Sequence, residues 1–104
     1  MNAADISARI DRKEKALRAV AAASENVIAA KTDLEVIKTR YTLEGFSATN
    51  DKTRLAELNA KTEAERDAVA LAEKSLREAQ LELDLANLRM QEATMLLKVV
   101  EQKV

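Results

Sequence analysis

Charged side chains are the groups in this sequence that could do chemistry, because the other reactive types are absent or rare. The 104 residues include 18 Asp and Glu and 17 Lys and Arg, but no histidine, no cysteine and one glycine. Without histidine or cysteine, the commonest general base and the commonest metal ligands are missing. The carboxylates Glu63, Asp67 and Glu78 have Lys or Arg nearby in sequence, which is typical of surface ion pairs on a helix. We therefore predict no enzyme activity, no catalytic residue, no cofactor and no metal site.

One run of basic residues stands out between positions 9 and 18. Its cations, which outnumber Asp11 and Glu14, are Arg9, Arg12, Lys13, Lys15 and Arg18. A solvated helix face is the favoured interpretation, because no aromatic side chain interleaves with the run to stack on bases. A patch that contacts nucleic-acid phosphates is the alternative, and self-association would double its charge.

The elements that must position these groups are helices. Apolar residues make up 47% of the chain and charged residues 34%, while aromatic residues make up 2% and proline is absent. This composition is typical of a coiled coil or long helices. The formal net charge of −1 gives no global attraction for nucleic acid or membrane. No apolar run is long enough to cross a bilayer and the first residues lack a signal-peptide pattern, so we expect a single cytoplasmic domain without membrane contact.

The second half of the sequence carries a heptad repeat. One column of it contains Leu55, Thr62, Val69, Leu76, Leu83, Met90, Leu97 and Val104. The companion column, three residues later, contains Leu58, Glu65, Ala72, Ala79, Ala86, Ala93 and Val100. This alternating spacing predicts a long helix with a coiled-coil seam. Alanine in the companion column would let a neighbouring helix approach closely.

The first half has the same spacing with more polar members. One column contains Ile6, Lys13, Val20, Val27, Leu34 and Tyr41. The column three residues before it contains Ala3, Ile10, Leu17, Ser24, Lys31 and Lys38. We predict that these two columns form the seam of the first helix.

The chain breaks once, at the only glycine. Gly45 is a natural helix stop, and the residues after it are turn and N-cap types, so we expect the second helix to be capped by Thr49 or Asn50. Asn2 and Asp5 have the spacing of a capping box for the first helix. The sequence predicts one domain with helix 1 over about 3–42, a turn over about 43–50 and helix 2 over about 51–102.

These features predict an all-α fold: two long helices in an antiparallel coiled-coil hairpin. If the helices fold back at the turn, the numbers of facing residues should sum to about 96. This register places Lys31 opposite Glu65 and Ile10 opposite Ala86. The two charges that interrupt the seam would then pair with each other.

The second helix has more apolar surface than one partner can cover, so we expect a homo-oligomer. A helix that is apolar on two sides is normally sandwiched, and a dimer forming a four-helix bundle is the simplest closed arrangement. For the C-terminal residues the alternative is a frayed end. The predicted oligomer interface contains Leu81, Leu85, Leu88, Leu96, Leu97, Val100 and Val104.

The turn places both aromatic residues of the chain, Tyr41 and Phe46, at one end of the hairpin. We favour a small cluster of these side chains with Leu55 and Leu58. A tip that binds a protein partner is the alternative, because exposed aromatic side chains on a rigid support make good binding sites.

A short pattern at this turn resembles one in small coiled-coil helical-hairpin proteins of phages and prophages. The matching residues are Glu44, Gly45, Asn50, Arg54, Ala56 and Leu58. The resemblance implies a viral accessory protein in a bacterial host, with no specified activity, and a structural role for Arg54 at the turn carbonyls or Glu44. A second resemblance, at Leu43-Glu44-Gly45, is to the helical hairpins of type VII secretion. The tryptophan and export signal of that group are missing.

We therefore predict a non-enzymatic interaction or accessory protein that binds a protein partner. One alternative is a nucleic-acid-binding oligomer that uses residues 9–18. Others are a type VII secretion-like hairpin and an oligomer that binds a small ligand between subunits.

Overall fold

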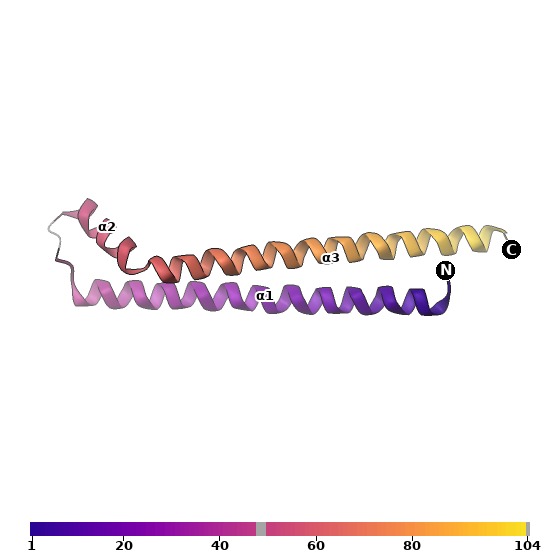
Figure 1. The fold of residues 1–104 in the computed structure, drawn as a ribbon, viewed down its shortest axis with the longest axis horizontal. Coiled ribbons are helices and arrows are strands. Elements are labelled where there is room, and N and C mark those ends of the chain that lie inside the picture. The colour runs from indigo at the N-terminus through magenta and orange to yellow at the C-terminus, as the bar shows by residue number, and fades with distance from the viewer. Residues whose placement is uncertain (48–49, 104) are drawn as a thin grey trace. The chain divides into compact units, whose positions relative to one another are not determined.

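The protein is all-α. The computed structural model describes residues 1–47 and 50–103, and these form three helices and no strand. The helices are α1 (Ala3–Glu44), α2 (Asp51–Lys61) and α3 (Glu63–Lys103), as Figure 1 shows. The all-α prediction is confirmed. The predicted cap Thr49 and interface residue Val104 lie outside the described residues.

Contacts divide the chain into two compact units. Unit 1 comprises Met1–Ala23 and Leu76–Val104, and unit 2 comprises Ser24–Ser75. Each unit pairs a segment of α1 with a segment of α3, and α2 belongs to unit 2. The single-domain expectation stays a prediction.

The helix ends follow the predicted capping residues. The Asn2 side chain accepts a hydrogen bond from the Asp5 amide at 2.9 Å, and the Asp5 carboxylate accepts one from the Asn2 amide at 3.0 Å. These reciprocal bonds are a capping box. Gly45 has φ +86°, and its N–H donates to the Tyr41 carbonyl at 3.1 Å, as expected where glycine ends a helix in the left-handed region. Asn50 caps α2 by accepting from the Thr53 amide at 2.9 Å.

The second helix is interrupted at Thr62, where the heptad pattern predicted one helix over 51–102. Thr62 is fully buried, and both its amide and its hydroxyl donate to the Leu58 carbonyl, at 3.0 and 2.8 Å. Thr39 makes the same bond to its preceding turn within the unbroken α1, so the full burial of Thr62 is what distinguishes this position. The guanidinium of Arg66 donates to the carbonyl of Asn59, which satisfies one of the last acceptors of α2. The spacing of the apolar residues does not report such side-chain bonds, so it could not predict the interruption.

In unit 1 the two segments run antiparallel and meet through alanines. Arg9 on α1 donates to the carbonyl of Arg89 on α3, while Ala16, further along α1, shares a groove with Ala86, earlier on α3. The buried residues of this unit are Ala16, Ala23, Ala86 and Ala93, which are 3–8% exposed. Alanine on both helices brings the backbones close together.

One of the two predicted seam columns of α1 is wrong. Ile10 and Leu17 are 43% and 48% exposed, and they lie outside the seam. The companion column instead follows the Ile6 column by three residues and contains Arg9, Ala16, Ala23, Ala30 and Ile37, all buried or half-buried. The Ile6 column itself is confirmed, since every member is half-buried or buried. The small alanines take the seam because they permit the closer approach.

In unit 2 the predicted pairing of Lys31 with Glu65 is wrong. The Lys31 ammonium lies 3.7 Å from the Glu73 carboxylate instead. Glu65 stays in the seam, half-buried, and its Oε2 is a buried atom without a hydrogen-bond partner among the described residues. Lys31 is exposed and Glu73 is half-buried, so their ion pair flanks the seam and stabilises it weakly.

Candidate interaction surface

An apolar stripe runs along the face of α3 in unit 1 that points away from the alanine seam. Successive members are separated by three, four or seven residues, which keeps them on one side of a helix. We call it the outer stripe: Leu81, Leu85, Leu88, Met95 and Val99, which are 40–68% exposed. Glu92 occupies the one polar position in the spacing. α3 is therefore apolar on two opposite faces in this unit, and the described chain covers one of them.

The C-terminal interface residues are exposed as well. Leu96 and Leu97 are just over two-fifths exposed, and Val100 is more exposed than either. Leu96 borders a groove with Met1, Asp5 and Arg12. Of the predicted interface, then, each member among the described residues has a solvent-accessible apolar side chain.

A groove with an alanine floor and charged walls runs between α1 and α3 in unit 1. Its lining is Arg12, Lys15, Ala16, Ala19, Glu82, Ala86 and Arg89. The groove was not predicted, although alanine recurring every seven residues on both helices was the available signal. Three cations converge here from two helices. None of them has an ion-pair partner among the described residues.

The structure separates the predicted basic patch into two groups. Arg9 and Lys13 are half-buried towards the seam, and Arg9 also lies 3.5 Å from the Glu92 carboxylate. Arg12, Lys15 and Arg18 are exposed. The patch therefore presents three free-standing cations of α1, and Arg89 of α3 joins two of them in the groove.

Polar contacts organise the tip of unit 2. The Glu57 carboxylate accepts hydrogen bonds from the Ser47 amide and hydroxyl at 3.3 and 3.0 Å and lies 3.2 Å from the Lys61 ammonium. That ammonium sits 5.1 Å from the centre of the Tyr41 ring, a cation–π distance. Arg54 pairs with Asp51 at 3.9 Å.

The predicted tip cluster forms only in part. Tyr41, Phe46 and Leu58 are half-buried, whereas Leu43 and Leu55 are exposed. Of the two aromatic side chains, Tyr41 contacts α2 through the Lys61 ammonium, and the two exposed leucines remain available at the surface.

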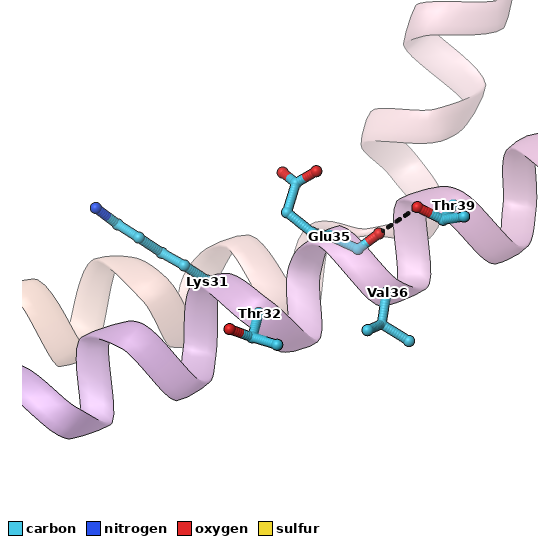
Figure 2. A pocket seen from close by; sticks show the side chains of 5 residues that line it. All are labelled: Lys31, Thr32, Glu35, Val36 and Thr39. Atoms are coloured by element: carbon cyan, nitrogen blue, oxygen red, sulfur yellow. Dashed lines mark hydrogen bonds between the residues drawn. The ribbon is translucent and has the colours of Figure 1, made fainter.

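A further hollow in unit 2 lies on α1 alone. Its lining is Lys31, Thr32, Glu35, Val36 and Thr39, and Figure 2 shows these side chains spread along one helix. The Thr39 hydroxyl donates to the Glu35 carbonyl at 2.8 Å, and Glu35 lies 3.6 Å from Lys38. Thr39 and Glu35 are engaged with their own helix, and Lys31 pairs with Glu73 of α3. The lining side chains do not converge on a common point, so the hollow is not a candidate catalytic or binding site.

The described residues contain no metal cluster or membrane-spanning helix, and comparisons with known proteins give no match. No cluster of three or more metal-ligating side chains exists among the described residues, and no described helix is long and apolar enough to cross a membrane. No family model matches the chain, and neither a curated protein nor a solved structure matches it significantly.

Proposed function

We propose that this protein is a non-enzymatic interaction module: an antiparallel coiled-coil hairpin that self-associates through its outer stripe and works by binding a protein partner. The resemblance at the turn suggests a phage or prophage accessory protein as its setting. The observation that carries the proposal is the distribution of apolar side chains. Among the described residues, the buried apolar side chains are four alanines and Val27, while the large side chains of the outer stripe are exposed.

Burial energies support association over a solitary chain. Each buried alanine removes about one methyl group from water, worth about 0.8 kcal/mol, whereas a leucine contributes roughly 1.5–3 kcal/mol when fully buried. The exposed leucines of the outer stripe therefore hold a large hydrophobic contribution that the described chain does not use. A second copy offers the same stripe, and an interface that matches itself closes after two subunits.

Sedimentation equilibrium tests the proposal. We expect the wild-type chain to sediment as a dimer and the L85K/L88K double variant to sediment as a monomer, because lysines would be desolvated at the centre of the stripe. The matched control is I28K/V36K on α1 in unit 2, which also replaces two exposed apolar residues and should leave the dimer intact. A monomeric wild type, or a control that dissociates as fully as L85K/L88K, would overturn the proposal.

Nucleic-acid binding is a second candidate, favoured by the convergence of Arg12, Lys15 and Arg89 on one groove. Phosphate contacts would make affinity for labelled DNA or RNA fall steeply with salt. We expect R12E/K15E to abolish such binding and R40E/K52E, which reverses two exposed cations of unit 2, to preserve it. Equal losses in both variants, or no binding by the wild type at low salt, would exclude this candidate.

A further inference from the structure

The centre of the outer stripe is flanked by two opposite charges, Glu82 and Arg89, that form no ion pair with the described residues. Glu82 and Arg89 are exposed and line the same groove with Ala86, so they lie on one side of α3. Neither makes an ion pair within the described part of the chain. They are seven residues apart, about 10 Å along the helix, and so they cannot pair with each other. Leu85 and Leu88 lie between them in the sequence.

We propose that two copies pack their outer stripes antiparallel around a two-fold axis, with Leu85 of each copy against Leu88 of the other. This inference rests on the self-association proposed above. In this arrangement Glu82 of one copy faces Arg89 of the partner, and the two-fold axis makes the same pair a second time. Glu82 and Arg89, which are unpaired among the described residues of one copy, thus form two ion pairs between the two copies, next to the contacts of Leu85 with Leu88.

A parallel arrangement of the same stripes is less favourable. It would place Glu92 of one copy directly opposite Glu92 of the other, so two like charges would meet in the apolar interface between the copies. In the antiparallel arrangement Glu92 faces Leu81 near the end of the stripe, where it keeps its contact with Arg9 at 3.5 Å. The parallel arrangement would also form different ion pairs, because Arg77 would face Glu82 and Asp84 would face Arg89.

Charge reversal distinguishes the two arrangements. We expect E82R to weaken the dimer by at least about tenfold in dissociation constant, because it creates two arginine–arginine contacts. The double variant E82R/R89E restores both pairs in the antiparallel arrangement and should return the constant to within about threefold of wild type. R77E, a control at another exposed cation of α3, should leave it unchanged. A parallel dimer would give the reverse: no rescue by the double variant and weakening by R77E.

Cysteine crosslinking gives an independent test, because the chain contains no cysteine. In the antiparallel arrangement an L81C chain mixed with an E92C chain should form a disulfide-linked heterodimer on air oxidation. L81C alone should not crosslink, since its two sulfurs would be separated by about 16 Å along the helix axis. An L81C homodimer, or no mixed crosslink, overturns the inference. If the wild type is a dimer that L85K/L88K dissociates, that result leaves the proposed self-association standing.

Discussion

Replacing Glu65 with alanine should raise the free energy of unfolding by about 1 kcal/mol. Glu65 occupies a seam position, and its Oε2 is buried without a hydrogen-bond partner among the described residues. A buried polar atom left unsatisfied costs about 1–3 kcal/mol, and the E65A substitution removes this cost. Alanine at position 65 would also extend the column formed by Ala72, Ala79 and the alanines that follow them.

Three smaller terms set the size of the gain. Losing the half-buried methylenes of Glu65 forfeits about 0.8 kcal/mol. Glu65 lies in the first turn of α3, where a negative charge is favourable by about 0.5 kcal/mol. The higher helix propensity of alanine returns a few tenths of a kcal/mol. The desolvation term outweighs the two losses, so stabilisation is the expected sign.

Glu63 provides the matched control, because it lies in the same first turn of α3 and is exposed. E63A removes the same charge from the same turn without relieving a buried atom, so we expect no gain or a loss of about 0.5 kcal/mol. Urea unfolding followed by circular dichroism at one protein concentration measures both variants, since self-association would couple stability to concentration. If E65A destabilises the protein as much as E63A does, the Glu65 carboxylate is not desolvated and the reasoning fails.

Three further variants test the helix ends and the C-terminal residues. G45A should lower the free energy of unfolding by about 1 kcal/mol in the same urea assay: a Cβ there meets no atom within 4 Å, so the φ of +86° alone determines the loss. N50A should cost about 1 kcal/mol and expose the Thr53 amide to faster hydrogen exchange, because α2 is an 11-residue helix with no buried residue; an unchanged Thr53 rate would contradict this. Deleting residues 96–104 should shift the sedimentation mass towards monomer and lower the melting temperature, and an unchanged mass would mean that association uses only Leu81, Leu85, Leu88 and Met95 of the outer stripe.

Features set by local chemistry could be predicted from the sequence. Gly45 ends α1 because only glycine adopts its φ without strain, and Asn50 and Asn2 cap helices through their own side chains. The inward column of α3, from Val69 to Met90, was predictable because large apolar side chains mark it.

Features set by packing between helices could not be predicted in the same way. A column at Ile6 allows the companion column to lie on either side of it, and the larger side chains of Ile10 and Leu17 favoured the wrong side. Alanine is common both on helix surfaces and in close seams, so Ala16 and Ala23 carried little information until their neighbours were known. The wrong companion column also contains Lys31, which was predicted to pair with Glu65 and pairs with Glu73 instead.

In unit 1 the alanines of the seam and the exposed outer stripe are two consequences of how the apolar residues are distributed around α3. Alanines in the seam allow the two helices to approach closely, and the large side chains of the outer stripe lie on the opposite face of α3. Had Ile10 and Leu17 filled the seam, the helices would lie further apart and more apolar surface would be buried within the chain. Because the seam residues are small, less apolar area is buried within one chain, and more remains exposed on the outer face of α3. It follows that E65A, which extends the seam, should stabilise the fold without strengthening the dimer, whereas L85K/L88K should dissociate the dimer while the alanine contacts within each chain persist.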